Sequence, residues 1–168
     1  MKILIAYHSD TGNTEKVAKA MKEGLDEEGQ EVILLHTKDC DPASLGSYDL
    51  VLLGTCIIGG SPGKSAQNII RKVTELPPKI AFFYTHGSNR PYPKAFKRLG
   101  KKLEQGNTKV LGTFECIGEN TTWTEEEQLN MVPPEKREEA KKYMDSIKGR
   151  PNEQDLAEAK KFAKSLVK

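Results

Sequence analysis

The chain has 168 residues, of which 36% are hydrophobic and 30% charged, enough for one hydrophobic core, so we expect a single domain over residues 1–168. Its 26 basic and 24 acidic side chains leave a formal charge of +2, which is too balanced to favour a nucleic-acid or membrane partner. Three widely spaced cysteines argue against a disulfide framework and a zinc motif. The sequence shows no leader segment and no apolar run long enough to span a bilayer. Together with the odd number of cysteines, this predicts a cytoplasmic protein.

Five apolar runs of strand length alternate with segments of helical spacing. The strand-length runs are residues 2–7, 31–36, 49–55, 79–84 and 109–116. The segments with apolar residues every three or four positions are 14–28, 65–75, 94–104 and 154–167. Because the first, third and fourth apolar runs are almost continuously hydrophobic, they predict strands buried on both faces, as in a parallel sheet covered by helices. We therefore expect a doubly wound α/β domain with five parallel strands.

The loop after the first strand, Ser9 to Thr14, is rich in hydroxyl and amide groups and contains no lysine or arginine. A helix that begins at Thr14 directs its free N–H groups into this loop, and Gly12 permits a tight turn, so the loop is suited to a phosphate. A nucleoside-triphosphate loop needs a lysine, and a dinucleotide loop needs three spaced glycines, which excludes both. A plain helix cap is the structural alternative.

Residues 119–148, between the fifth strand and the last helix, form an insertion. The insertion has an acidic start, a Pro133–Pro134 break and a charged, helix-like run over 135–147. These features favour a segment that docks on the rest of the molecule or on a second copy of the chain, which leaves a homo-oligomer possible.

The first loop and its flanks, YHSDTGNTEKVAKAM, resemble the N-terminal signature of flavodoxins. The likeness extends to DLVLLGTCIIGGSPG, AFFYTHGSNRPYP and GRPNEQDLAEAKKFAKSL, and covers most of residues 1–118 and 149–168. It implies a flavodoxin-like sheet with strand order 2-1-3-4-5 and FMN as the cofactor.

The resemblance also implies which residues surround FMN. The loop that holds its phosphate consists of Ser9, Asp10, Thr11, Gly12, Asn13 and Thr14. One side of the isoalloxazine is lined by Thr55, Cys56, Ile57, Ile58 and Gly59. The other side is lined by Thr85, His86, Gly87 and Tyr92. We assign no catalytic residue and no metal ligand.

Individual residues near this site allow two interpretations each. Tyr92, between two prolines, is the best candidate to stack on the flavin, and otherwise is a surface tyrosine. Trp123 either folds across the site or packs the insertion on the body. His86 either contacts the flavin edge or hydrogen-bonds to backbone. Gly59 and Gly60 either turn a carbonyl toward the flavin N5 or form a plain turn.

The favoured function is an FMN-binding electron carrier that exchanges electrons with redox partner proteins. The alternative is an FMN-dependent NAD(P)H or quinone-type reductase, in which the insertion shapes a substrate pocket. A partner-binding module without flavin is disfavoured by the phosphate loop. Because Lys64, Arg90 and Lys94 occur in the loops expected around the ring, which carry no carboxylate over residues 55–65 and 85–94, we also expect a mildly positive field at the flavin.

Overall fold

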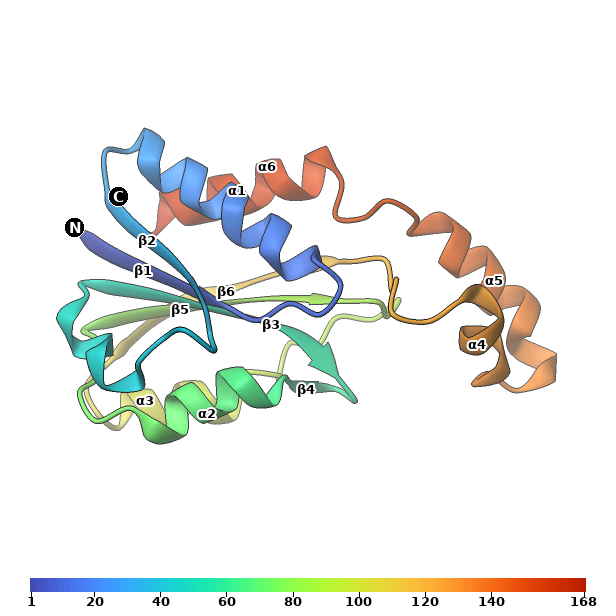
Figure 1. Ribbon diagram of the computed structural model, residues 1–168, viewed down its shortest axis with the longest axis horizontal. Coiled ribbons are helices and arrows are strands. Elements are labelled where there is room, and N and C mark those ends of the chain that lie inside the picture. Colours follow the sequence, from blue (N-terminus) through green and yellow to red (C-terminus); the bar gives the residue numbers. More distant parts are fainter.

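Five parallel strands form a sheet through the middle of the molecule in the computed structural model, which describes residues 1–168 (Figure 1). The strands occur in the order β2-β1-β3-β5-β6, which confirms the expected doubly wound topology. A two-residue strand, β4, pairs antiparallel with the end of β3 and lies outside this order. The bounds are β1 (Lys2–Tyr7), β2 (Glu31–His36), β3 (Leu50–Ile58), β4 (Ser61–Pro62), β5 (Lys79–His86) and β6 (Lys109–Ile117).

Helices cover both faces of the sheet (Figure 1). One face carries α1 (Asn13–Glu27) and α6 (Glu153–Ser165), which lie side by side. The other carries α2 (Lys64–Lys72), α3 (Lys97–Glu104) and a 3₁₀ segment, Pro42–Ser47. No helix is both long and apolar enough to cross a membrane.

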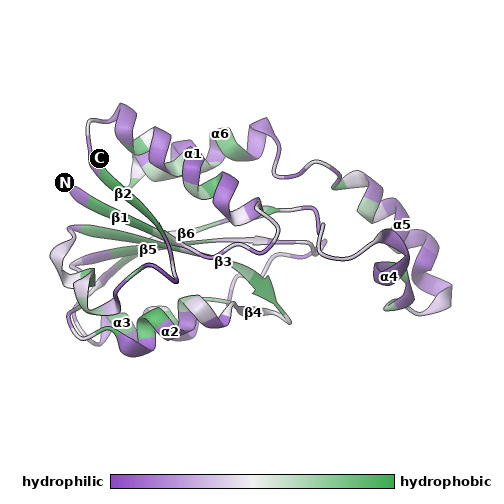
Figure 2. Ribbon diagram, viewed as in Figure 1, coloured by the Kyte–Doolittle hydropathy of each residue, from purple (hydrophilic) through white to green (hydrophobic).

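Two hydrophobic cores, one on each face, explain why the strand sequences are hydrophobic without interruption. In β1, Leu4 and Ala6 belong to the core under α2 and α3, whereas Ile3 and Ile5 belong to the core under α1 and α6. All four side chains are fully buried. A strand that alternates between two cores has no polar face, as parallel sheets require. Figure 2 shows the resulting hydrophobic strands at the centre of the molecule.

The end of β3 differs from the sequence-based expectation. The third strand was expected to end at residue 55, but β3 continues to Ile58 and turns back through Gly59 and Gly60 into β4. Both glycines have positive φ, 56° and 78°, which a two-residue hairpin turn of this hand requires. The two glycines therefore form a hairpin turn, and a carbonyl directed toward the flavin N5 stays a prediction.

Two helix predictions also need correction. The third expected helix begins at Lys97 instead of residue 94, because residues 94–96 form turns. Within the insertion, the expected helix over 135–147 is a short 3₁₀ turn (Pro134–Lys136) followed by α5 (Arg137–Ser146). A further helix, α4 (Glu125–Asn130), precedes it and starts at a capping box of Thr124 and Glu127. Both insertion helices project beyond the sheet and are mostly hydrophilic (Figures 1 and 2).

Candidate functional site

A cavity of about 540 Å³ opens at the carboxyl ends of the parallel strands. It lies between the first loop, the β3–β4 hairpin, the end of β5 and the insertion. Its volume falls within the range of small-molecule sites, and its position is where ligands bind in doubly wound sheets. Eleven of the residues expected at the site line it: Asp10, Thr11, Asn13, Cys56, Ile57, Ile58, Gly59, Thr85, His86, Gly87 and Tyr92.

The first loop leaves the start of α1 open to a ligand. Gly12 is the N-cap residue of α1 and adopts a left-handed conformation with φ 82°, and no side chain caps the helix. The hydroxyl groups of the loop therefore do not serve as the plain helix cap that was the alternative. The N–H groups of the first turn and the positive end of the helix dipole remain free for an anion.

Four of the expected residues do not line the cavity but support it: Ser9, Gly12, Thr14 and Thr55. The fully buried Thr14 shares a 2.8 Å hydrogen bond between its Oγ1 and that of Thr85, which ties α1 to the end of β5. The Thr55 hydroxyl donates to the Cys56 carbonyl at 3.3 Å. The buried hydroxyl of Ser9 has no hydrogen-bond partner in the protein.

The insertion supplies one wall of the cavity, and hydrogen bonds at its base fix its position. Asn13 Nδ2 donates to the Glu119 carbonyl at 2.7 Å, which joins the first loop to the start of the insertion. The Glu119 carboxylate accepts from the Gly149 N–H at 2.8 Å, and the Glu119 N–H donates to the Arg150 carbonyl. Seven insertion residues line the cavity: Glu119, Asn120, Thr122, Trp123, Gln128, Met144 and Ile147.

Of these seven, sequence reasoning singled out only Trp123, and Ser88 and Gly118 outside the insertion were also missed. One signal for the first insertion residues was available. Because β6 is parallel to its neighbour, the chain leaves it at the same edge of the sheet as the first loop.

His86 is a buried polar residue on the cavity wall. It is 8% exposed, and its Nδ1 has no hydrogen-bond partner in the protein. Burial lowers the pKa of His86, and this outweighs the opposing effects of Glu115, whose carboxylate lies 4.0 Å from Nε2, and of the Ser88 backbone. The ring packs edge to face against Tyr92, with centroids 5.4 Å apart. His86 is therefore a neutral imidazole near pH 7, able to donate or accept a hydrogen bond.

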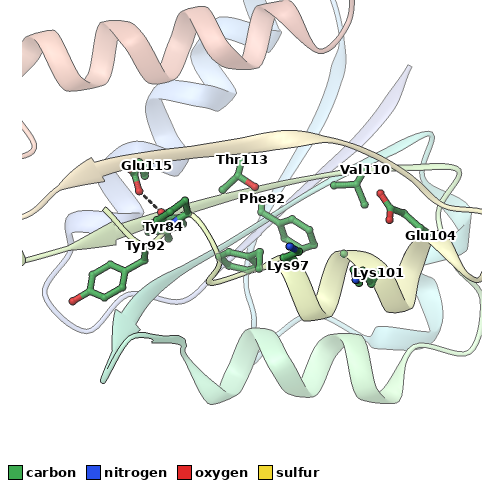
Figure 3. A pocket seen from close by; sticks show the side chains of 12 residues that line it. Phe82, Tyr84, Tyr92, Lys97, Lys101, Glu104, Val110, Thr113 and Glu115 are labelled. Carbon is green, nitrogen blue, oxygen red and sulfur yellow. Dashed lines mark hydrogen bonds between the residues drawn. The ribbon is translucent and has the colours of Figure 1, made fainter. Parts of the chain in front are cut away.

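Tyr92 separates the site from a second cavity on the α3 side of β5 and β6, because its side chain lines both. In this second cavity the Tyr84 hydroxyl donates to the Glu115 carboxylate (Figure 3). Burial and this hydrogen bond raise the pKa of Tyr84 well above its ordinary value. Glu115 therefore lies between the hydroxyl of Tyr84 and the imidazole of His86.

The charges at the site are opposite in sign to those expected. The cavity is lined by two carboxylates, Asp10 and Glu119, and by no lysine or arginine. The expected mildly positive surroundings from Lys64, Arg90 and Lys94 are therefore wrong for the cavity wall. The expectation considered only the charges of residues 55–65 and 85–94. The two carboxylates come from the first loop and from the start of the insertion.

Asp10 is in contact with two neighbouring side chains. Its carboxylate lies 3.1 Å from His8 Nε2 and accepts a hydrogen bond from Cys56 Sγ at 3.5 Å. Burial and the Asp10 charge raise the pKa of the Cys56 thiol. The ligand atoms of His8, Asp10 and Cys56 lie within 4.8 Å of one another, a spacing compatible with a metal ion. The His8–Asp10 contact and the thiol hydrogen bond account for this proximity without one.

Comparison with known proteins gives consistent results. A family model described as "Flavodoxin domain" matches residues 4–164. An uncharacterised protein of Methanocaldococcus jannaschii is 30% identical over 100% of this chain and 99% of its own. A flavodoxin-like domain-containing protein of Clostridioides difficile, BilS, is 27% identical over 99% of this chain and 97% of its own. The crystal structure of oxidised flavodoxin 2 from Bacillus cereus superposes with a TM-score of 0.67 at 21% identity, covering 99% of this chain and 98% of that one.

Proposed function

The chain belongs to the flavodoxin domain family, and from this premise we propose that it binds FMN non-covalently and transfers electrons through it. The observation that carries the proposal is the uncapped N-terminus of α1, which opens into a cavity of suitable size beside a hydroxyl-rich loop. A phosphate needs donors there, and a flat ring needs apolar walls, and the cavity offers both.

The hydrogen-bonding groups that surround the cavity are of the kinds that FMN needs. Thr11 and the first turn of α1 offer neutral donors to a dianionic phosphate. A flavin ring also carries polar atoms on its edge. The buried Nδ1 of His86, which has no partner in the protein, supplies a group that such an edge would satisfy.

Holding the phosphate falls to the first loop. Its backbone N–H groups and the helix dipole stabilise negative charge without a lysine, so the cofactor is bound with no strong countercharge beside it. The Thr14–Thr85 hydrogen bond and the Asn13–Glu119 hydrogen bond hold the loop against β5 and the insertion. The site is therefore rigid before a ligand arrives, which lowers the entropic cost of binding.

Orienting the ring falls to the walls. Four residues expected beside the ring line the cavity: Ile57 and Ile58 on the β3–β4 hairpin, and His86 and Tyr92 on and after β5. We expect the first two to face one side of the ring and the second two to face the other. Trp123 on the insertion lines the same cavity. When bound, FMN supplies one- and two-electron transfer, and the protein tunes it by hydrogen bonds and charge. His86 offers the partner-free Nδ1 as a hydrogen-bonding group that a flavin edge would satisfy, while Nε2 lies 4.0 Å from the Glu115 carboxylate.

A second candidate function is an FMN-dependent reductase of NAD(P)H or quinones. The observation that favours it is the wall formed by the insertion, which places Trp123, Met144 and Ile147 on the same cavity as the first loop. A carrier needs only an exposed cofactor edge, whereas an enzyme needs a pocket for a second molecule. We rank the carrier first, because the insertion residues leave Trp123 46% exposed instead of forming a closed pocket.

Redox partner proteins are the proposed partners of the carrier, and a homo-oligomer through the insertion remains a proposal. The proposed compartment is the cytoplasm. All three cysteines are free thiols, which supports a reducing environment: Cys40, Cys56 and Cys116.

The proposal is tested by titrating the apoprotein with FMN while the quenching of flavin fluorescence is followed. We expect Thr11→Ala to weaken binding by roughly 10- to 150-fold, the value of one hydrogen bond to a charged group. Thr74→Ala, an exposed threonine at the opposite end of the sheet, is the matched control and leaves affinity unchanged. Equal affinities of both variants and the wild type would rule out the first loop as the phosphate site.

The carrier and the reductase differ in turnover. We expect the FMN-loaded protein to show no steady-state oxidation of NADH or NADPH with a quinone acceptor. Sustained turnover that disappears in Trp123→Ala would favour the reductase, because Trp123 lies on the insertion wall.

A further inference from the structure

Charge is divided unevenly along this chain. From Lys64 to Glu104 there are ten basic and two acidic side chains, whereas the rest of the chain carries 16 basic and 22 acidic ones. Eight of the ten basic residues are exposed on α2, on α3 or in the turns before α3, and we call them the α2/α3 basic face. They are Lys64, Arg71, Lys72, Lys94, Lys97, Arg98, Lys101 and Lys102. The balanced total charge therefore conceals one strongly basic face.

The basic face has no acidic partners within the protein. None of its eight side chains makes an ion pair, whereas eight lysines and arginines elsewhere are paired with carboxylates. Unpaired like charges on adjacent helices repel one another and cost stability. The face is therefore not explained by folding, and its charges are available to a partner.

A groove lined by basic residues extends from this face to the candidate site. The groove lies between α2 and α3, has a volume of about 580 Å³ and has no carboxylate on its walls. Four of its lining residues are cations, and Tyr92 closes the end near the site. Because Tyr92 also lines the site, the groove and the site are neighbours across a single side chain. The four cations are Arg71, Lys94, Arg98 and Lys102.

A second hollow on α3 extends the same charge. It is lined by five members of the basic face and Gln105, with no apolar side chain. Figure 3 shows two of the five, Lys97 and Lys101, projecting from α3 at the cavity next to Tyr92. The charge thus covers a broad surface, larger than a single phosphate would need.

We propose that the α2/α3 basic face docks a partner protein that presents an acidic surface, and that docking brings the partner's redox centre to the Tyr92 edge of the site. The redox role rests on the proposed function, whereas recognition of acidic groups does not. In the transfer step, one electron leaves the reduced cofactor of this chain and reduces the oxidised centre of the partner by one electron. No bond is formed or broken between the two proteins.

A protein is favoured over a nucleic acid by the composition of the groove. Proteins that bind single strands stack successive bases on several aromatic side chains, and Tyr92 is the one aromatic residue in the groove. Ile70 and Leu99 line the groove beneath its basic rim. An apolar centre with a charged rim is the usual anatomy of a protein interface.

The first experiment needs no flavin. A fluorescein-labelled oligoglutamate peptide is titrated with the apoprotein at low salt. We expect the double variant Arg98→Glu/Lys102→Glu to lose binding by roughly tenfold or more, since rim charges dominate such association. The control, Lys161→Glu/Lys168→Glu, has the same net charge change on exposed residues outside the face and keeps binding within about twofold.

Three results of this experiment would overturn the proposal. They are an equal loss in both double variants, no binding by the wild type, and tighter binding of a single-stranded DNA of equal charge than of the peptide. Because the apoprotein is used, a failure here is separate from a failure to bind FMN.

The second experiment uses the reduced, FMN-loaded protein and two one-electron acceptors, a strongly acidic b5-type cytochrome and a strongly basic c-type cytochrome. We expect the rate constant with the acidic acceptor to fall as salt is added and that with the basic acceptor to rise, because salt screens attraction and repulsion alike. Arg98→Glu/Lys102→Glu should reduce the rate with the acidic acceptor by roughly tenfold. A rate with the acidic acceptor that rises with salt would contradict docking at this face.

Discussion

The two helical layers of this molecule treat charge in opposite ways. On the α1/α6 layer, Lys160 pairs with Glu27 at 2.6 Å and with Glu23 at 3.5 Å, and Lys164 pairs with Glu27 at 2.6 Å. Hydrogen bonds from both lysines lower the pKa of Glu27 to about 2. On the α2/α3 layer, none of the eight exposed cations has an acidic partner. The same sheet therefore carries one layer that is neutralised internally and one that is not.

The difference shows that net charge is a poor guide to the surface of this protein. The backbones of α1 and α6 also lie close together, because a Cβ at Gly24 would lie 2.8 Å from the Lys160 carbonyl oxygen. Its charges serve packing between two helices. The α2/α3 layer holds its charges beside the Tyr92 edge of the candidate site, where they can serve a partner.

The largest expected effect comes from removing the ion pair that anchors α6, in which Asp155 is buried and Arg150 is 30% exposed. Asp155 is 5% exposed, accepts from Arg150 Nε at 2.9 Å and forms the capping box of α6 with Asn152. We expect Asp155→Ala to lower the free energy of unfolding by about 3 kcal/mol, because Arg150 loses its partner. Urea denaturation measures this. The exposed pair of Asp145 and Lys148 is the control, and Asp145→Ala should leave the midpoint almost unchanged.

The same residue predicts an acid sensitivity. Burial alone would raise the pKa of Asp155, but hydrogen bonds from Arg150 and from the Asn152 N–H hold it below its ordinary value. A carboxyl with a lowered folded-state pKa contributes stability above its unfolded-state pKa, and this contribution is lost as pH falls through the folded-state value. Wild type should therefore lose stability below about pH 4, and Asp155→Asn should lose less over the same interval. Parallel curves for both proteins would contradict this.

A glycine in each layer gives a sharper comparison. Gly24→Ala in α1 forces a methyl group against the backbone of α6 and should destabilise the protein by about 1–3 kcal/mol. Gly100 in α3 has only ordinary contacts at 3.7 Å and beyond, so Gly100→Ala should stabilise it by about 0.5–1 kcal/mol through helix propensity. Thermal unfolding of both variants checks the signs. Destabilisation of equal size would show that α3 is packed as closely as α1.

The smallest expected effect concerns charges at the site itself. Glu119 lines the cavity, so a negative charge added to a bound flavin is disfavoured, whereas Arg90 lies outside it. Two unit charges about 8 Å apart at an effective dielectric near 40 interact by roughly 1 kcal/mol, or about 45 mV for one electron. We expect Glu119→Gln to raise the potential of the last reduction step by about that amount.

The measurement is a spectroelectrochemical titration of the FMN-loaded protein. Arg90→Gln is the control and should leave the potential unchanged. A lower potential in Arg90→Gln with no change in Glu119→Gln would restore the positive field that the sequence alone suggested.

Hydrophobic periodicity predicted the parallel sheet because it reports burial on both faces, whereas the strand order was implied by the resemblance to flavodoxins. The sequence also predicted the turn before α1, because the conformation of Gly12 depends on neighbouring residues in the chain and not on distant contacts. The extension of β3 to Ile58 was missed, because a strand that continues past Thr55 depends on pairing with β4 across Gly59 and Gly60.

Long-range features were the hardest to predict. The hydrogen bond between Asn13 and Glu119 joins residues 106 positions apart, and no local pattern marks it. That contact holds the start of the insertion, and with it Glu119, beside the first loop. The basic face was missed for a different reason: only the charge of the whole chain was used to judge its partners, although the excess of basic residues over 64–104 is visible in the sequence.

The most direct test of the central claim compares two ligands that differ only in the phosphate. The apoprotein is titrated with FMN and with riboflavin under the same conditions, with flavin fluorescence as the readout. A phosphate held by the first loop adds several hydrogen bonds to a charged group, each worth roughly 1.5–3 kcal/mol. We therefore predict that FMN binds about 100-fold more tightly than riboflavin, or more. Equal affinity for the two ligands would contradict a phosphate site at the start of α1.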